Sequence, residues 1–454
     1  MDNGSAAKSQ LRPREATHLT PVGLPPSAVA PPSFLGHPRE FWILAFVELW
    51  ERFGFFLMMS LLVLFMNERW QMSQGAAMKW FSYYITAVYF SPVIGGYIAE
   101  RGLSRPQWVA VGAALLSIGY FGFALGSRES MVIWFGLLVL GNGLFKPNIA
   151  TLVGNLYAPG DPRRDSAFSY FYFAVNVGGA ISPNIGGYLR THFGWRVAFS
   201  AAGVGLILAV LVLLYFARSY RHLDAARAMA TEQTEHTTSA VQRVAALFLI
   251  SICALPFWTA IMQSGSSLAI WARDNTDRSF SLFGWSMQVA PEQFASLGSW
   301  FIILLTVPLT KLLERLYGGR GIHSAVKIGL GLVLSAVAFG LLSLCAAQLG
   351  SGQASMLWLV GYYFVFTIGE LLLSPVGLSI VSKLAPPRWV GVMIGVWLLS
   401  TASGNLLVGV LGDYWEIWSH AQYFAVVAAG LLCAALLLLT QLRFLRRVIP
   451  SQQS

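Results

Sequence analysis

Long apolar stretches recur along this chain, and short polar segments separate them. Each stretch is long enough for a helix to cross the hydrocarbon core of a bilayer, which takes about 20 residues. Lipid offers no partner for unpaired backbone groups, so a membrane span is either a helix or a strand of a closed barrel. The pattern lacks the alternating strands of about ten residues that are typical of a membrane barrel, so we expect helices. Twelve stretches are predicted to span the membrane, at residues 41–66, 78–98, 107–126, 131–157, 166–189, 196–217, 244–271, 296–317, 326–348, 355–381, 389–411 and 421–442.

Polar segments divide these spans into two sets of six. Residues 1–36 are rich in proline and lack the apolar core of a signal peptide, which predicts a disordered cytoplasmic tail. Residues 219–243 are too polar to cross a bilayer and form a predicted cytoplasmic linker. The pattern therefore predicts one six-helix bundle over 37–218, a second over 244–445, and a short cytoplasmic tail over 446–454.

Composition and charge support a membrane protein and set its orientation. Only 11% of the residues are charged and 56% are hydrophobic, whereas soluble domains carry about 25% charged residues. The net charge of +10 invites a nucleic-acid partner. With a cytoplasmic N-terminus, however, 21 of the 30 Lys and Arg residues fall on the inner side and 7 on the outer side. This bias follows the positive-inside rule, so we expect both termini in the cytoplasm and no nucleic-acid partner.

Five charged residues lie deep inside predicted spans: Glu48, Glu51, Arg52, Lys146 and Glu370. Charges within a membrane are costly and indicate a functional site. Glu48 and Arg52 are four residues apart and share a helix face. Glu370 has no basic residue at the same depth in the second half, so it needs a proton or an external amine. Two structural alternatives remain open: an ion network that joins the first and fourth spans, and a neutral, packed Glu370.

The signs of these charges favour a zwitterionic ligand. Arg52 binds a carboxylate through two parallel hydrogen bonds, and Lys146 contributes a point charge. Glu370 supplies an anion for an ammonium group. A small molecule with both groups would bridge the two halves of the chain, and the lipid bilayer would be the other partner.

Other chemistries find little support. Cys253, Cys345 and Cys433 all lie in predicted spans, without the spacing of a metal or redox motif, and we interpret them as packing residues. No histidine falls in the middle of a span, and no GxxxxGK[ST] loop is present. We therefore expect a carrier rather than an enzyme, with no metal, no cofactor and no obligate protein partner.

Several long motifs carry a family resemblance. ELWERF (48–53), FKPNIATLVGNLY (145–157), the span at 168–189, the segment 369–405 and GGYIAERG (95–102) resemble motifs of the proton-dependent oligopeptide transporters. That family belongs to the major facilitator superfamily. The resemblance implies an all-α integral membrane protein with two six-helix bundles and a site between them at mid-membrane. It also implies symport of di- and tripeptides with protons by alternating access, in a bacterial inner membrane.

The resemblance assigns roles to individual residues. Glu48, Glu51, Arg52 and Lys146 match the cluster that couples protons and binds the substrate carboxylate. Glu370 matches the residue that faces the peptide amino terminus.

Four further residues match the peptide site. Asn176 and Tyr89 correspond to polar positions, and Trp258 and Trp397 correspond to aromatic positions of the side-chain pockets. Ordinary core packing remains an alternative for each of the four.

The chain also departs from the family pattern. Phe55 and Phe56 stand where tyrosines are usual, and Gly298 stands where the family has asparagine. Met59 and Met262 replace an arginine and a glutamate that close the outer gate as an ion pair. Replacing both partners with apolar residues avoids stranding a buried charge, so we expect a methionine–methionine contact at this gate. These departures keep open a carrier of another peptide-like or small organic solute, with altered or absent proton coupling.

Overall fold

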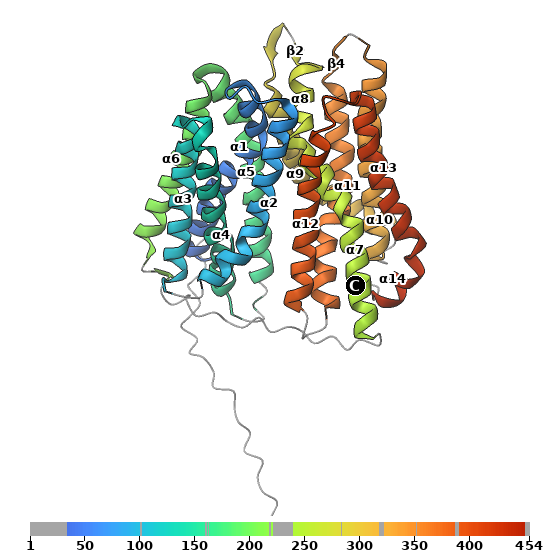
Figure 1. The fold of residues 1–454 in the computed structure, drawn as a ribbon. Coiled ribbons are helices and arrows are strands. Elements are labelled where there is room, and N and C mark those ends of the chain that lie inside the picture. Colours follow the sequence, from blue (N-terminus) through green and yellow to red (C-terminus); the bar gives the residue numbers. More distant parts are fainter. Residues whose placement is uncertain are drawn as a thin grey trace, which may run out of the picture.

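The computed structural model describes residues 34–99, 102–158, 161, 163–217, 219–220, 239–282, 284–316, 322–350, 352–385 and 390–449. Long helices stand side by side in two groups, one from each half of the sequence (Figure 1). The helices of the first half are α1 (Arg39–Glu68), α2 (Gln74–Ala99), α3 (Arg105–Leu125), η2 (Arg128–Ser130), α4 (Met131–Asn155), α5 (Arg163–Phe193) and α6 (Trp195–Tyr215).

The second half repeats this arrangement with shorter elements between its long helices. These elements are α7 (Ala240–Ile261), η4 (Met262–Gly265), α8 (Ser267–Asp274), η5 (Pro291–Ala295), α9 (Ser296–Leu316), α10 (Ser324–Gln348), α11 (Leu357–Leu384), α12 (Val390–Gly412), α13 (His420–Thr440) and α14 (Leu442–Val448). Most of the predicted linker and nearly all of the predicted N-terminal tail lie outside the described residues.

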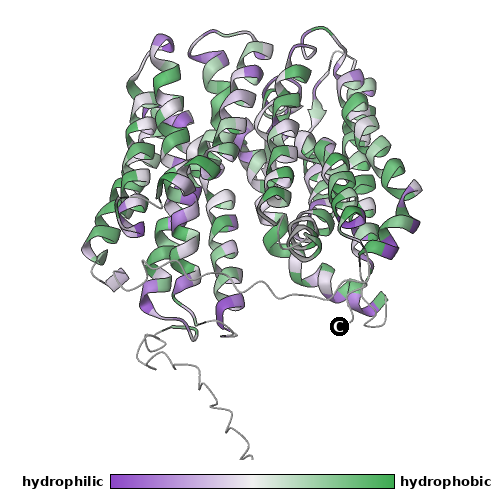
Figure 2. Cartoon of the chain, turned by 60° about the horizontal axis from the view of Figure 1, so that its bottom comes forward, coloured by the Kyte–Doolittle hydropathy of each residue, from purple (hydrophilic) through white to green (hydrophobic). Residues whose placement is uncertain are grey.

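The helices agree with the predicted spans within a few residues at most ends. Within the described residues, ten helical segments are long and apolar enough to cross a membrane. Helices α2 and α5 are of similar length but are not among these ten segments, and they pack among the others. Hydrophobic residues cover the helix bodies, and hydrophilic residues gather toward the helix ends and loops (Figure 2). The prediction of an all-α, multi-pass membrane protein is confirmed; twelve crossings and two cytoplasmic termini stay predictions.

The predicted span at 244–271 corresponds to a helical segment, Ala240–Asp274, that is long and apolar enough to cross a membrane, but this segment is not one continuous α-helix. Helix α7 ends at Ile261, and one 3-10 turn, η4, leads to Ser266, whose φ of −123° and ψ of −99° are not helical. Gly265 lies so close to both helices that a Cβ there would clash with the Met59 carbonyl of α1 and stand 2.8 Å from the Phe81 ring of α2. A regular helix with a larger residue could not make this approach, so the break lets the chain pack onto α1 and α2.

Two short sheets also lie outside the helical pattern. Strands β2 (Ser279–Leu282) and β3 (Trp285–Gln288) form an antiparallel hairpin, and β1 (Thr276–Asp277) pairs in parallel with β4 (Ala354–Ser355). They lie at the end of the molecule away from the labelled C-terminus (Figure 1). We call this end the outer end and the opposite end the inner end, following the predicted topology.

The two halves are held together at the outer end by charged side chains. Arg190 of α5 donates to both carboxylate oxygens of Glu292 in η5, at 2.6 and 3.2 Å. Glu68 of α1 lies 3.7 Å from Arg190 and 3.5 Å from Arg273 of α8. We call these four residues the outer ion cluster. A separate pair, Lys79 to Asp413 at 2.8 Å, links α2 to the end of α12.

Candidate functional site

A chamber of about 300 Å³ lies between the two halves. Its size suits a small organic molecule, since ligand pockets begin at about 300 Å³. Helices α1, α2 and α5 contribute one side, and α7, η4, α9 and α11 contribute the other. Seven of the residues predicted from the sequence line it: Arg52, Met59, Tyr89, Asn176, Trp258, Met262 and Glu370.

Helical periodicity brings the α1 residues to the chamber. Phe55 and Phe56 follow Arg52 by three and four residues, and Met59 follows them by four and three, so these side chains share one face. The guanidinium of Arg52 lies over the Phe55 ring, 4.6 Å from its centroid. This cation–π interaction stabilises the positive charge of Arg52 at a buried position.

Arg52 belongs to a buried ion network. Its Nε and Nη2 donate to the two carboxylate oxygens of Glu51, each at 2.5 Å, and Nε also lies 3.5 Å from Glu48. Lys146 of α4 donates to Glu48. Glu48 and Glu51 are almost completely buried, and Arg52 is 8% exposed. Nη1 of Arg52 makes no hydrogen bond within the described residues, so one edge of the guanidinium remains available to a ligand.

Glu370 of α11 lines the same chamber and is half-buried. Across the described part of the chain it has no ion-pair partner and no side-chain hydrogen bond. Tyr89 of α2 lines the chamber together with Arg52 and Glu370. The chamber therefore holds a cation from one half and an anion from the other.

Lys146 and Trp397 are not among the residues that line the chamber. Lys146 is held by Glu48 and reaches Arg52 only through that carboxylate. Trp397 packs edge-on against Trp258, with ring centroids 5.9 Å apart, and therefore sits behind a lining residue. Glu48 and Glu51 likewise lie behind Arg52. None of these four residues lines the chamber itself.

Asn176 of α5 is buried beside the chamber. Its amide nitrogen donates to the Tyr172 carbonyl at 3.0 Å, one helical turn earlier. This bond orients the side chain and leaves the amide oxygen as the group that can accept from a ligand.

Sequence reasoning missed several lining residues of α11. Tyr363, Phe366, Thr367 and Ser374 stand at helical spacing from Glu370 and all line the chamber. The signal was present, because residues three or four positions from an intramembrane charge share its face. Tyr172 of α5 is related in the same way to Asn176 and was also missed.

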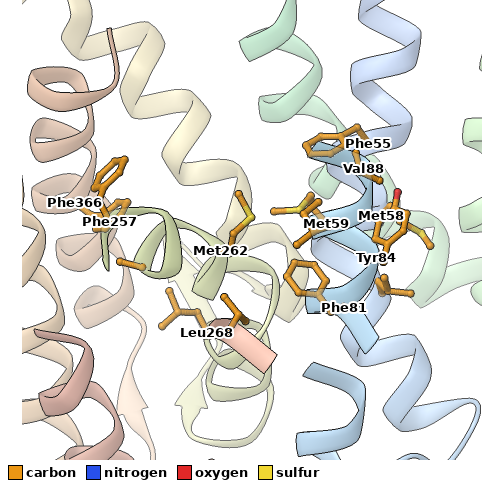
Figure 3. Close-up of a cluster of buried hydrophobic side chains, with 14 of the residues drawn as sticks. Phe55, Met58, Met59, Phe81, Tyr84, Val88, Phe257, Met262, Leu268 and Phe366 are labelled. Carbon is orange, nitrogen blue, oxygen red and sulfur yellow. The ribbon is translucent and has the colours of Figure 1, made fainter. Parts of the chain in front are cut away.

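Met59 and Met262 lie toward the outer end of the chamber. Their side chains point toward one another from α1 and η4, whereas Met58 lies on the side away from Met262 (Figure 3). Both are buried, at 8% and 3% exposure, and Gly265 packs against the backbone of Met59. The hypothesis of a methionine contact at the gate stays a prediction.

A groove of about 570 Å³ runs along α5 and α9 from the chamber. It shares Tyr172, Asn176 and Ile302 with the chamber and continues to Phe168 and Val307, nearer the inner ends of these helices. The outer ion cluster lies beyond the other end of the chamber. The space between the halves therefore extends toward the inner end.

The sequence matches the POT family over residues 107–227 and 222–421. The chain belongs to the POT family. This membership confirms the resemblance seen in the motifs, and it makes the protein a transporter rather than an enzyme. It also agrees with the two-bundle fold of the major facilitator superfamily.

The relatives of this POT-family member include named peptide carriers. A di-/tripeptide transporter of Lactococcus lactis subsp. cremoris is 27% identical, with 90% of this chain and 96% of that protein covered. Dipeptide and tripeptide permease A of Escherichia coli is 28% identical, with 82% and 83% covered. A crystal structure of a POT family transporter in complex with 5-aminolevulinic acid has a TM-score of 0.84 at 25% identity, covering 92% of this chain and 99% of that one.

Proposed function

We propose that this POT-family member imports di- and tripeptides together with protons, by alternating access across a bacterial inner membrane. The observation that carries the proposal is the pair of opposite charges in one chamber, Arg52 from the first half and Glu370 from the second. A peptide backbone has a carboxylate at one end and an ammonium at the other. Named relatives that transport di- and tripeptides support the same substrate class.

In this proposal the substrate carboxylate binds the open edge of Arg52, and the ammonium binds Glu370. Asn176 and Tyr89 contribute polar contacts to the peptide backbone, and Trp258, with Trp397 behind it, forms an aromatic side-chain pocket. Lys146 acts through Glu48, because its amine contacts that carboxylate rather than the chamber.

Proton coupling follows from competition for the two cations. A substrate carboxylate that takes over Arg52 leaves Glu48 and Glu51 less well paired, so these acids accept protons more readily. The linkage is reciprocal: protonation releases the cations for the substrate. One proton crossing about 100 mV supplies roughly 2.3 kcal/mol. A gradient of one pH unit adds about 1.4 kcal/mol, which together supports accumulation of several hundredfold.

Movement would divide between the bundles at 37–218 and 244–445, joined by the linker at 219–243. The proton is the only coupling ion in this proposal. Within the described residues, no three His, Cys, Asp or Glu side chains are grouped so that they could hold a metal ion.

The test is uptake of labelled dialanine by purified protein in liposomes, with and without an acidic exterior. We expect uphill accumulation that collapses when a protonophore dissipates the gradient, and loss of binding in Glu370→Gln. Glu314→Gln, at an exposed position of α9, is the matched control. Absence of dipeptide uptake under both conditions would contradict the proposal.

A second candidate is a same-fold carrier of another small zwitterion with altered or absent proton coupling. Phe55 and Phe56 favour it, because both line the chamber without the hydroxyls usual in the family. A solved relative binds 5-aminolevulinic acid, which also carries an amine and a carboxylate. Uptake of labelled 5-aminolevulinic acid without uptake of dipeptides, in the same liposomes, would favour this candidate.

A further inference from the structure

The outer part of the chamber is apolar. Met59, Ile261, Met262 and Gly265 line it, and we call these four residues the methionine roof. Phe55 also lines the chamber, but it lies under the Arg52 guanidinium and is not part of the roof. Among all described residues that line the chamber, the charged ones are Arg52 and Glu370, and neither belongs to the roof. Met59 stands seven residues after Arg52 on α1, about 10 Å nearer the outer end. The roof is therefore spatially separate from the α1 cation.

Two polar side chains of η4 lie beside the roof, and both are hydrogen-bonded within the protein. Ser264 lines the chamber, and its hydroxyl donates to the Ile261 carbonyl at 3.0 Å. Gln263 is fully buried, and its oxygen accepts from Tyr423 at 3.0 Å and from Ser267 at 2.5 Å. Its nitrogen donates to the Thr259 carbonyl at 3.3 Å. These bonds direct the amide away from Met262 toward α13, so the roof presents thioether and hydrocarbon groups to the chamber.

Such a surface discriminates between substrate side chains by chemistry. An apolar side chain gains free energy when it leaves water and contacts the two thioethers, which adapt to different shapes because methionine is flexible. A charged side chain at the same place would lose its hydration without meeting an opposite charge. An arginine and glutamate at these two positions would instead offer a partner to either sign.

We propose that the methionine roof determines substrate specificity by accepting an apolar side chain of the transported peptide and rejecting a charged one. This inference rests on the proposed function. It goes beyond a gate contact, because a gate acts equally on every substrate, whereas the roof changes the ranking among substrates.

The experiment measures competition against labelled dialanine uptake in liposomes under one fixed pH gradient. Unlabelled alanyl-leucine, alanyl-lysine and alanyl-glutamate are the competitors. We expect alanyl-leucine to compete at least about tenfold better than either charged peptide. The ratio of inhibitory concentrations is the readout, so differences in the amount of active protein cancel.

Two charged variants then test the roof directly. Met262→Glu should move the ratio toward alanyl-lysine, and Met59→Arg should move it toward alanyl-glutamate, each about tenfold or more. Opposite shifts from the two variants support the proposal, because a general loss of activity cannot produce them. Unchanged ratios in both active variants overturn it.

Neutral variants decide the question if the charged variants do not fold. Met59→Ala and Met262→Ala enlarge the roof, and we expect alanyl-tryptophan to improve relative to alanyl-leucine. Met58→Ala is the matched control, because Met58 is buried on α1 but does not line the chamber, so its ratio should stay that of the wild type. If all three variants give the same ratio, the roof does not determine specificity and this inference is overturned. The proposed function would still stand in that case, provided that the wild type takes up dipeptides. A wild type that moves no dipeptide overturns both.

Discussion

At the scale of single residues, the two carboxylate oxygens of Glu48, beside Arg52, have different surroundings. One oxygen of Glu48 contacts Lys146 and lies near Arg52. The other oxygen, Oε2, is buried and has no hydrogen-bond partner within the described residues. A proton could be added there without displacing Lys146. An unpaired buried carboxylate oxygen is costly, which makes Glu48 the residue where coupling is best tested.

We expect Glu48→Gln to abolish proton-driven accumulation while it preserves exchange of labelled for unlabelled substrate. The amide keeps the shape of the side chain but cannot gain or lose the proton. Both activities are measured in liposomes, with Glu40→Gln in the first turn of α1 as the control. A Glu48→Gln protein that still accumulates substrate against its gradient would show that the coupling proton resides elsewhere.

At the scale of elements, the turn η4 decides how α7 meets α1. It places Gly265 against the Met59 backbone and turns Met262 toward Met59 (Figure 3). A mid-helix stretch of 3-10 geometry often marks a hinge. The structure leaves no room for a side chain at Gly265, so we expect closure of the outer side to depend on this contact.

Gly265→Ala should impair closure of the outer side. The added methyl would stand 2.8 Å from the Phe81 ring and nearer still to the Met59 carbonyl. We expect uptake to fall by about tenfold or more, in line with a contact worth over about 1.4 kcal/mol. Gly361→Ala on α11 is the control, because a Cβ there meets nothing within 4 Å. Normal uptake by Gly265→Ala would show that this close approach is dispensable.

The contact between α1 and η4 has a direct chemical test. With Cys253, Cys345 and Cys433 replaced, Met59→Cys combined with Met262→Cys should form an oxidative cross-link, since the two side chains point toward one another. Met58→Cys combined with Met262→Cys should not, because Met58 faces the other side of α1. If the Met59 and Met262 pair never cross-links in any state, the contact does not exist.

For the whole molecule, the outer ion cluster is a buried charged link between the two halves. The Glu292 side chain is fully buried and Arg190 is 18% exposed, so their interaction is screened less than a surface pair. Opening the outer side would separate α5 from η5 and expose this carboxylate. The cluster thus favours the state in which the outer side is closed. It does so with charged residues other than the family's usual gate pair, whose positions are occupied here by Met59 and Met262.

We expect Glu292→Gln to destabilise the folded protein, with an upper limit of about 3–5 kcal/mol because Arg190 keeps some contact with water and with Glu68. Thermal unfolding in detergent measures the loss. The double variant Arg190→Met with Glu292→Met should lose less than the two single variants combined, since neither charge is stranded. Strict additivity would show that the pair contributes no coupling energy.

The resemblance of several long motifs indicated the family. Local spacing and the bilayer were enough to predict the helices and the face of α1 that carries Arg52 and Met59. Both predictions depend only on residues that are close together in the sequence. The shared face of α1 follows from 3.6 residues per turn, and the helices follow from the cost of unpaired backbone groups in lipid. Lys146 shows the limit: its charge marked it as functional, but only packing showed that it contacts Glu48 and not the chamber.

Contacts between distant segments required the tertiary structure. Arg190 and Glu292 are 102 positions apart, and nothing in their local sequence indicates that they pair. The break at η4 likewise depends on how closely α1 and α2 approach Gly265. Periodicity says which side of a helix faces a protein neighbour, whereas the identity of that neighbour depends on how all the helices pack together.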